Sequence, residues 1–247
     1  MVNNPVIIIP ARMAATRLPG KPLADIAGKP MIVHVMEAAK NANIGPVFVA
    51  VAEEEIVREV DLAGGSAILT DPELPSGTDR ICAALDQIDA NKKHDVVINL
   101  QGDIPTIEPD DIKKVLLPLD NDQVDIATLV APITDESEKD NPSVVKPIVA
   151  WSKDKLGRAL YFTRAKAPND DGPHYHHIGI YAYRREAIEK FRTLPPSDLE
   201  KREKLEQLRA MENGMRIDVY EIENIPFGVD TPEDLEKARK ILEKETV

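Results

Sequence analysis

Four β-branched residues in succession, Val6 to Ile9, lie close to the start of the chain. A run that is apolar at every position, rather than at alternate ones, is typical of a strand buried on both faces, as in a parallel sheet. Pro10 ends the run. The loop that follows brings Arg12, Arg17 and Lys21 to the carboxyl end of this strand. Open α/β sheets bind ligands at that end, so three cations there predict an anionic ligand.

The same loop is rich in small residues. Ala11, Ala14 and Ala15 would allow backbone N–H groups to approach phosphate oxygens closely, which together with the cations fits a triphosphate. The segment matches neither the Walker A pattern nor the dinucleotide pattern G-x-G-x-x-G. An ordinary surface loop of Arg, Gly, Lys and Pro is therefore the alternative, and other parts of the chain must decide between them.

Strand-like and helix-like patterns alternate through the first half of the chain, which predicts a Rossmann-like, mostly parallel α/β sheet. The expected strands are residues 6–9, 47–52, 67–70 and 96–100, and the expected helices are residues 30–43, 53–63, 78–87 and a segment from about Pro109. Pro30 and Pro109 suit the first turns of their helices.

The pattern changes after Val124, where strands follow one another without long helices between them. We expect strands at 124–131, 144–151 and 178–183, then a helix at 199–212 and a strand at 217–222. They predict a smaller antiparallel layer, approximately residues 124–200, carried by a single domain that covers residues 1–247. This layer is also a plausible surface for a homodimer.

Composition excludes several classes of protein. The formal charge of −12, from 43 acidic and 31 basic side chains, disfavours nucleic acid, whose binding needs an excess of Lys and Arg. The single cysteine, Cys82, allows no intrachain disulfide and no cysteine metal cluster. The sequence shows no apolar run of membrane-spanning length and no signal-peptide pattern at its start, so we expect a cytoplasmic protein without membrane contact.

Two aspartates are candidate ligands for Mg²⁺. Asp103 follows the expected strand 96–100, at the same sheet edge as the cationic loop, where a carboxylate can hold the metal against phosphate oxygens. The alternative is an Asx turn. Asp230 precedes Thr231 and Pro232, a sequence that also starts a helix well, and from spacing alone either Asp230 or Thr231 is better explained as the cap.

Two further segments carry candidate binding residues. Ser76, Gly77 and Thr78 could cap a helix, or Gly77 could let a base or ribose lie against the backbone. Arg164 suits a substrate carboxylate, and Glu206 and Gln207 suit sugar hydroxyls, although the charged helix around Glu206 is more simply a solvated face.

Three histidines lie close together in the sequence, at His174, His176 and His177. They are suited to sugar hydroxyls, but their spacing also raises the possibility of zinc. The spacing H-x-H-H on an expected strand or loop is not expected to bring an acidic or thiol fourth ligand close to these rings, so we do not favour the zinc interpretation.

Taken together, these segments resemble the family of 3-deoxy-manno-octulosonate (Kdo) cytidylyltransferases, also called CMP-Kdo synthetases. The resemblance covers nearly the whole chain and keeps the family's order of motifs. These are PARMAATRLPGKPL, GKPMIVHV, SGTDR, NLQGD, ALYFTRA, HHIGIYAYR, REKLEQLR and GVDTPEDLE.

The resemblance implies a role for each matching residue. Lys21, Arg12, Asp103 and Asp230 would carry catalysis, with Mg²⁺ held by Asp103 and Asp230. Nucleotide binding would involve Pro10, Ala11, Arg12, Lys21, Ser76, Gly77, Thr78, Arg80 and Gln101. Sugar binding would involve Gln101, Arg164, His177, Tyr181, Glu206 and Gln207.

Three positions depart from the family's usual residues. Ile104 stands where the family has Glu, Leu74 where it has His, and Ala15 where it commonly has Ser. Ile104 removes a possible second carboxylate beside Asp103, so affinity or substrate preference could differ.

The expected reaction is attack of the C2 hydroxyl of Kdo on the α-phosphorus of CTP, giving CMP-Kdo and pyrophosphate for lipopolysaccharide biosynthesis. Positioning and charge neutralisation would dominate, so no side-chain base is expected. The rivals are 8-amino-8-deoxy-Kdo or a sialic acid as substrate and, from another class, an inactive nucleotide-binding regulator.

Overall fold

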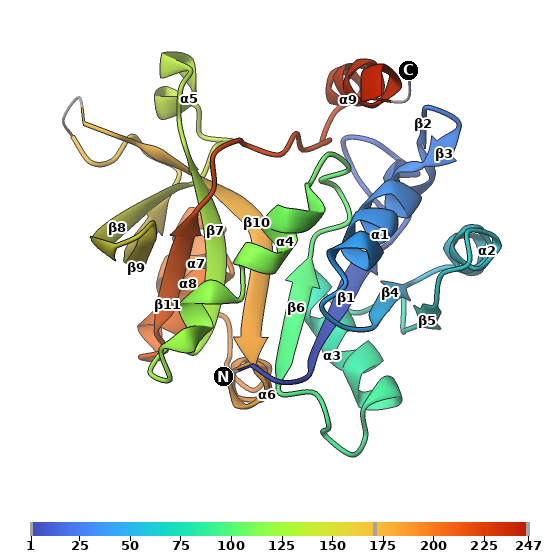
Figure 1. Cartoon of the computed structure of the whole chain (residues 1–247), viewed down its shortest axis with the longest axis horizontal. Coiled ribbons are helices and arrows are strands. Elements are labelled where there is room, and N and C mark those ends of the chain that lie inside the picture. Colours follow the sequence, from blue (N-terminus) through green and yellow to red (C-terminus); the bar gives the residue numbers. More distant parts are fainter. Residues whose placement is uncertain (1, 170–171, 246–247) are drawn as a thin grey trace. The chain divides into compact units, whose positions relative to one another are not determined.

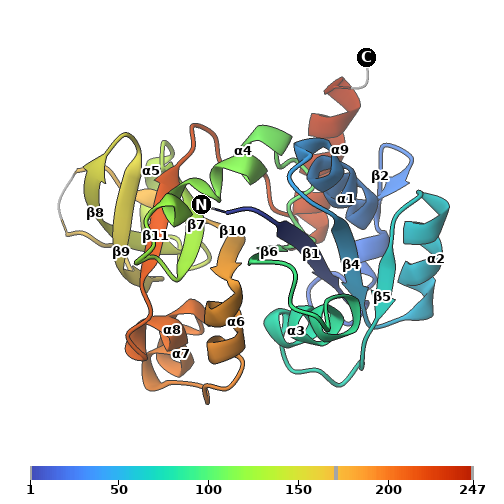
Figure 2. The same cartoon turned by 60° about the horizontal axis from the view of Figure 1, so that its bottom comes forward.

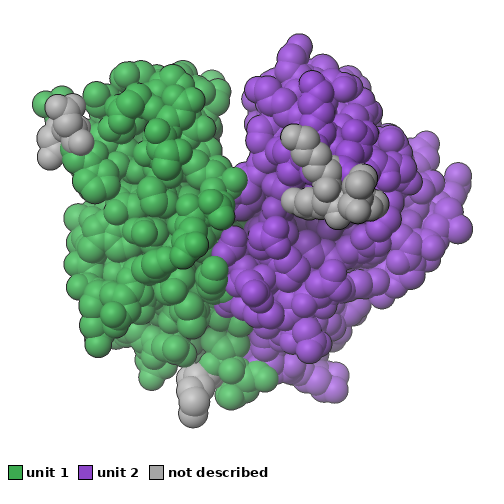
Figure 3. Space-filling model, turned by 45° about the horizontal axis from the view of Figure 1, so that its top comes forward, with its two compact units in different colours: residues 1–3, 114–225 green, residues 4–113, 226–247 purple. Residues whose placement is uncertain are grey.

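The computed structural model describes residues 2–169 and 172–245. Its internal contacts divide the chain into two compact units, which Figure 3 distinguishes by colour. Unit 1 comprises residues 1–3 and 114–225, and unit 2 comprises residues 4–113 and 226–247. Within the described part of the chain, no helix combines the length and the apolar character needed to cross a membrane.

Unit 2 is built on four parallel strands in the order β5-β4-β1-β6. The strands are β1 (Pro5–Ala11), β4 (Val47–Val51), β5 (Ala67–Leu69) and β6 (Val96–Leu100). Val6 to Ile9 are fully buried. The parallel sheet expected from the continuous apolar run is therefore confirmed.

Helices cover both faces of this sheet. Figures 1 and 2 place α1 (Met31–Ala42) and α3 (Gly77–Ile88) on opposite faces. The chain passes outward from β1 through α1 to β4 and returns through α3 to β6, so the order reverses between β1 and β6. The crevice at the carboxyl ends of two such strands is where open α/β sheets bind ligands.

The other elements of unit 2 are short, except for its last helix. They are η1 (Lys21–Leu23), β2 (Asp25–Ile26), β3 (Lys29–Pro30), α2 (Glu54–Leu62), α4 (Pro109–Lys114) and α9 (Pro232–Glu245). Pro109 and Pro232 are first helical residues, as expected, whereas Pro30 lies just before α1 because it closes the β2–β3 hairpin.

Unit 1 holds a mixed sheet in the order β10-β7-β11-β9-β8. Its strands are β7 (Ile126–Pro132), β8 (Lys146–Lys153), β9 (Leu156–Thr163), β10 (Tyr175–Arg184) and β11 (Ile217–Glu221). All pairings in this order are antiparallel except that of β11 with β7. The antiparallel layer is thus present, with β9 as a strand that the sequence analysis did not anticipate.

Unit 1 also carries η2 (Leu117–Asp120), α5 (Glu136–Asp140), α6 (Arg185–Phe191), α7 (Asp198–Glu203) and α8 (Gln207–Glu212). The prediction of a single helix over residues 199–212 is wrong, because a turn separates α7 from α8. Lys204 there adopts a left-handed conformation with φ 56°. Burial of Leu205 and Leu208 stabilises this turn against the helical preference of the sequence.

The start of α9 settles which residue is its cap. The Oγ1 of Thr231 accepts the N–H of Asp234 at 3.2 Å, and the Asp234 carboxylate accepts the N–H of Thr231 at 3.0 Å. This reciprocal pair is a capping box, so Thr231 is the cap. The side chain of Asp230 is left available for other partners.

We expect Thr231→Ala to lower the free energy of unfolding by about 1 kcal/mol, because it removes the side-chain half of the cap. Thr231→Ser keeps the hydroxyl and should stay near the parent value. Urea unfolding of the three proteins measures this. Equal losses for Ala and Ser would contradict the capping role.

Candidate active site

Unit 2 contains a cavity of about 380 Å³ at the carboxyl ends of β1 and β6, a volume typical of small-molecule sites. Five segments line it: the loop after β1, the start of α1, the first turn of α3, the turn after β6, and the residue Asp230 shortly before α9. The lining residues are Pro10, Ala11, Arg12, Ala14, Ala15, Thr16, Arg17, Leu18, Lys21, Pro22, Met31, Ser76, Gly77, Arg80, Gln101, Gly102, Asp103 and Asp230. Most residues predicted to bind nucleotide or metal are thus brought together.

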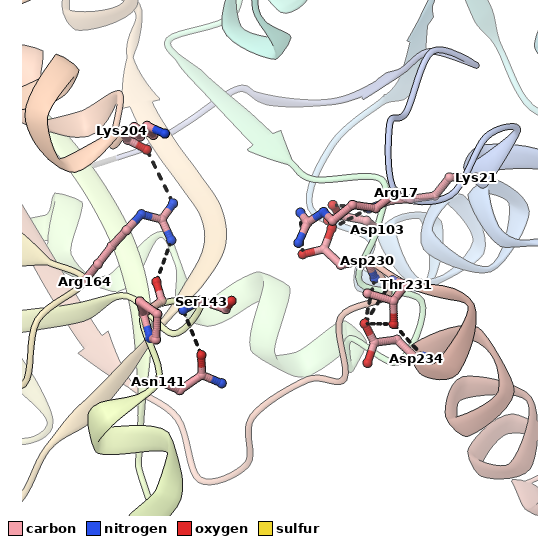
Figure 4. A network of polar contacts seen from close by, with 11 residues as sticks. Arg17, Lys21, Asp103, Asn141, Ser143, Arg164, Lys204, Asp230, Thr231 and Asp234 are labelled. Carbon is pink, nitrogen blue, oxygen red and sulfur yellow. Dashed lines mark hydrogen bonds and ion pairs between the residues drawn. The ribbon is translucent and has the colours of Figure 1, made fainter.

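Asp103 and Asp230 converge on one ammonium group. The Nζ of Lys21 lies 2.8 Å from Oδ2 of Asp103 and 3.1 Å from Oδ1 of Asp230. Arg17 contacts the other oxygen of Asp230 at 3.1 Å, as Figure 4 shows. The Lys21 side chain is only 14% exposed, so its charge is less screened here than on an open surface.

The loop after β1 has a defined internal geometry. Gly20 has φ 71°, which few other residues adopt without strain, and it precedes Lys21 at the start of η1. The N–H of Ala15 and that of Gly20 both donate to the carbonyl of Met13, at 2.9 and 3.2 Å. The Ala15 N–H, which we expected to face phosphate, is therefore committed within the loop.

Arg80 extends from α3 to the cavity wall with most of its guanidinium buried. Its Nη1 donates to Oγ1 of Thr70 at 2.6 Å and to the carbonyl of Asp71 at 3.1 Å. Its Nη2 is buried and has no partner among the described residues. Burial lowers the pKa of Arg80, and the charge of Glu53 opposes this. An Arg remains charged even so, and its unsatisfied donor calls for an acceptor from a ligand.

The segment Ser76 to Thr78 serves the helix and the cavity together. The Ser76 Oγ accepts the N–H of Asp79 at 3.1 Å and so caps α3, while Ser76 and Gly77 also line the cavity. Both interpretations of this segment therefore hold geometrically. Thr78 is buried in the first turn of α3 and does not line the cavity, so its nucleotide role stays a prediction.

The predicted sugar-binding residues of β10 lie together in unit 1. The rings of His177 and Tyr181 have centroids 5.3 Å apart, and Phe162 packs edge-on against His177 at 5.1 Å. Oγ1 of Thr128 lies 2.6 Å from the carbonyl of Ile180 and 3.0 Å from Nε2 of His177. Because the hydroxyl has one proton, which it donates to that carbonyl, the network assigns the ring proton of His177 to Nε2.

Burial dominates the titration of both rings. It lowers the pKa of His177 to about 3, and His176 adds to this effect. Burial also raises the pKa of Tyr181, with Glu206 as the second cause. His177 is therefore a neutral imidazole at physiological pH, with Nδ1 as an acceptor, and Tyr181 is a neutral phenol.

The break between α7 and α8 places Glu206 and Gln207 at the start of α8 instead of on a solvated helical face. Glu206 is partly buried, 3.7 Å from the Arg209 guanidinium. Gln207 is buried, and its Nε2 has no hydrogen-bond partner among the described residues. A buried amide donor without a partner is costly unless a ligand supplies the acceptor.

Arg164 is held mainly by backbone carbonyls. Its guanidinium donates to the carbonyls of Glu203 at 3.0 Å and Pro142 at 2.9 Å, with a weaker contact to Lys204 seen in Figure 4. Lys146 is fully buried, and its ammonium donates to the carbonyl of Arg164 at 2.9 Å. The orientation of Arg164 is thus fixed by its own unit.

The three histidines face different partners in the structure. His174 lies between the carbonyls of Gly172 and Pro168, at 2.9 Å from each, and His176 faces Glu138 at 3.4 Å. Within residues 2–169 and 172–245, no group of three or more His, Cys, Asp or Glu is arranged to hold a metal ion. Each histidine has its own local partner instead.

Ile104 and Leu74 do not line the cavity. Ile104 is 8% exposed and packs close to Gly228, in the loop that leads to Asp230. Its position favours a packing role beneath Asp103. The consequence of either departure for substrate preference stays a prediction.

Sequence reasoning did not assign roles to two residues that the structure connects to this site. Arg17 pairs with Asp230, although it was noted only as a loop cation. Glu53, just beyond the carboxyl end of β4, accepts the N–H of Met13 in the β1 loop at 3.0 Å. The signal was available, since β4 adjoins β1 and an acidic residue after it lies at the same sheet edge.

A parallel sheet with a cation-rich cavity at its switch point defines a nucleotide-binding α/β protein, and comparisons with known proteins make this specific. The profile of a family described as Cytidylyltransferase matches residues 6–217. The apo structure of a UDP-glucose pyrophosphorylase, 15% identical with a TM-score of 0.71 over 99% of this chain and all of that one, shares the fold.

Closer relatives identify the particular family. 3-Deoxy-manno-octulosonate cytidylyltransferases of Paramagnetospirillum magneticum and Rhodopseudomonas palustris (strain BisB5) are 55% and 59% identical, over 97% and 96% of this chain and 98% and 97% of theirs. The structure of a CMP:2-keto-3-deoxy-manno-octonic acid synthetase complexed with CTP is 40% identical, with a TM-score of 0.89 over 98% of this chain and all of that one. The chain belongs to the family of 3-deoxy-manno-octulosonate cytidylyltransferases.

The pKa of His177, lowered to about 3 by burial, predicts a pH effect on stability. In the unfolded chain this histidine binds a proton near pH 6.5, whereas in the folded chain it stays neutral down to about pH 3. The contribution of neutral His177 to the free energy of unfolding is therefore fully present above pH 6.5 and is lost as the pH falls toward 3. We expect His177→Gln to reduce the slope of unfolding free energy against pH in that window by up to about 1.4 kcal/mol per pH unit. Urea unfolding at several pH values measures the slope, and an unchanged slope would contradict a neutral His177.

Proposed function

We propose that this protein transfers CMP from CTP to the C2 hydroxyl of 3-deoxy-D-manno-octulosonate, forming CMP-Kdo and pyrophosphate for lipopolysaccharide biosynthesis. The observation that carries the proposal is the convergence of Lys21, Asp103 and Asp230 in a cavity at the sheet's switch point. Membership of the family supports the choice of nucleotide and sugar.

Unit 2 would hold CTP. Arg12 and Lys21 would neutralise the phosphates, and Gly77 lets the nucleoside lie against the start of α3. Arg80 brings a buried, unsatisfied donor to the same cavity. Gln101 also lines the cavity, and its Nε2 donates to Oδ1 of Asn99 at 2.8 Å, so the side-chain oxygen is the group that could accept a hydrogen bond from the nucleotide.

Asp103 and Asp230 would hold Mg²⁺. The chemistry of the donors fits, because Mg²⁺ prefers carboxylate oxygens and keeps phosphate or water as its remaining ligands. Their oxygens already face a common cation, the Lys21 ammonium. When bound, the metal would lower the pKa of the sugar hydroxyl and neutralise charge on the phosphates.

Unit 1 would hold the sugar acid. Arg164 suits the carboxylate, since its guanidinium is fixed by backbone carbonyls. Neutral His177 can accept a hydroxyl proton at Nδ1, and the phenol of Tyr181 can donate. Gln207 and Glu206 add a donor and an acceptor.

In the reaction, the C2 hydroxyl oxygen would attack the α-phosphorus, the bond to the β-phosphate oxygen would break, and the hydroxyl proton would pass to water. Lys21 and Arg12 would stabilise the negative charge that develops on the leaving pyrophosphate. Arg164 and Gln207 would bind the sugar acid and fix its orientation. No side-chain base is assigned.

We further propose that the protein acts in the cytoplasm as a homodimer. Its substrate CTP is a cytoplasmic nucleotide. The outer strands β8 and β9 expose two large apolar side chains, Trp151 at 39% and Leu160 at 53%, which support an interface within the 124–200 region.

The first test measures pyrophosphate release from CTP and Mg²⁺ with Kdo, 8-amino-8-deoxy-Kdo and N-acetylneuraminate in parallel. We expect release with Kdo, and a loss of at least about a hundredfold in kcat/KM for Asp103→Asn, because one metal carboxylate is removed. Asp110→Asn is the matched control, since Asp110 pairs with Lys113 outside the cavity.

Three other outcomes would contradict the proposal in different ways. Preference for the amino sugar would change the physiological substrate. Binding of CTP without release from any sugar acid would identify a regulator. Equal loss in the Asp103 and Asp110 variants would show that the effect is not specific to the cavity.

Gln207→Leu separates binding from stability. The variant removes a buried amide whose Nε2 has no partner among the described residues, so we expect unchanged or higher stability. We expect KM for Kdo to rise about tenfold with KM for CTP unchanged, because one hydrogen bond to the sugar is lost. Gln87→Leu, at an exposed glutamine of α3, is the control. An unchanged KM for Kdo would contradict the sugar role.

A further inference from the structure

Met13 occupies a special position in the loop that follows β1. Of residues 10–18, all of which the structure describes, it is the one that does not line the cavity. Its neighbours Arg12 and Ala14 both do. The backbone N–H and carbonyl of Met13 bond to other groups of the protein.

Both peptide groups of Met13 are used to hold the loop. Its carbonyl accepts the N–H of Ala15 at 2.9 Å and the N–H of Gly20 at 3.2 Å, which closes the loop on itself. Its own N–H donates to Oε2 of Glu53 at 3.0 Å. The two bonds to the carbonyl stabilise the conformation of the loop. The bond to Glu53 attaches the loop to the residue that follows β4 and precedes α2.

Glu53 belongs to the rigid part of unit 2. It follows β4, and β4 pairs with β1 in the register Ala11 to Val51, so Glu53 lies just beyond the paired ends of both strands. Its backbone carbonyl accepts the N–H of Ile56 at the start of α2, while its side chain makes no capping bond to that helix. The carboxylate is therefore not needed by α2.

We propose that Glu53 is a positioning residue, which fixes the phosphate-binding loop from behind through the N–H of Met13 and so presents Arg12 and the loop backbone to CTP. This inference rests on the proposed function, because it presumes that the loop binds the nucleotide. The hydrogen bond joins a charged acceptor to a partly buried donor, a strong class of protein hydrogen bond.

The negative charge of Glu53 and its hydrogen bond to Met13 have opposite effects on the binding of a polyphosphate. The Glu53 carboxylate stabilises the positive charge of Arg80, which lines the same cavity. Toward a polyphosphate, however, a carboxylate close to the cavity is repulsive. Replacing it with an amide keeps an acceptor for Met13 and removes the charge, whereas replacing it with alanine removes both.

The experiment compares Glu53→Ala, Glu53→Gln and the control Glu54→Gln, which changes an exposed residue of α2. The readouts are hydrogen exchange of the Met13 amide without nucleotide, and KM for CTP and kcat. For Glu53→Ala we expect about tenfold faster exchange and about tenfold higher KM for CTP, with kcat changed less than threefold. For Glu53→Gln we expect near-parental exchange and a KM no higher than the parent's.

Two results would overturn the proposal: Met13 exchange and KM within twofold of the parent in Glu53→Ala, or faster exchange with unchanged KM. An equally high KM in Glu53→Gln and Glu53→Ala would also overturn it, since the amide should rescue an anchoring role. Failure of the parent protein to bind CTP refutes the proposed function instead. The exchange data then still decide whether Glu53 anchors the loop.

Discussion

The organisation of unit 2 depends on the complete burial of β1. A strand with Val6 to Ile9 at zero exposure needs apolar cover on both faces and hydrogen-bonded neighbours at both edges. β4 and β6 provide the edges, and α1 and α3 provide the faces. Because the chain leaves β1 toward one side and returns to the other, the loops after β1 and β6 open into the same crevice. The site is thus a consequence of how β1 is buried.

Electrostatics then determines what this crevice can hold. The chain as a whole is strongly acidic, yet the crevice concentrates Arg12, Arg17 and Lys21, with Asp103 and Asp230 among them. In the structure Arg17 and Lys21 pair with the two carboxylates, which stabilises side chains that would otherwise repel their like-charged neighbours. A polyphosphate with a divalent cation satisfies the same pattern, since the anion takes the cationic partners and the metal takes the carboxylates.

Much of the fold and of the site was predictable because the signals were local. Continuous apolar runs identified β1, β4 and β6, and the polar residues just after them predicted the composition of the cavity. The prediction failed where packing overrode local preference. The charged segment around Lys204 has no helix breaker, yet burial of Leu205 forces a left-handed turn and starts α8 at Gln207. β9 has a mixed pattern, and only its pairing with β8 and β11 makes it a strand.

The sequence by itself determined the parallel sheet, the sheet edge that carries the ligand site, and the residue types gathered there, because strand periodicity and the direction of parallel strands follow from local pattern. Only the tertiary structure decided which side chains meet. In the structure Thr231 caps α9, and Asp230 pairs with Lys21. Gln207 is buried with an unsatisfied donor, and Glu53 accepts a hydrogen bond from Met13. These contacts join residues that are distant in sequence or have several possible partners, so spacing along the chain cannot select among them.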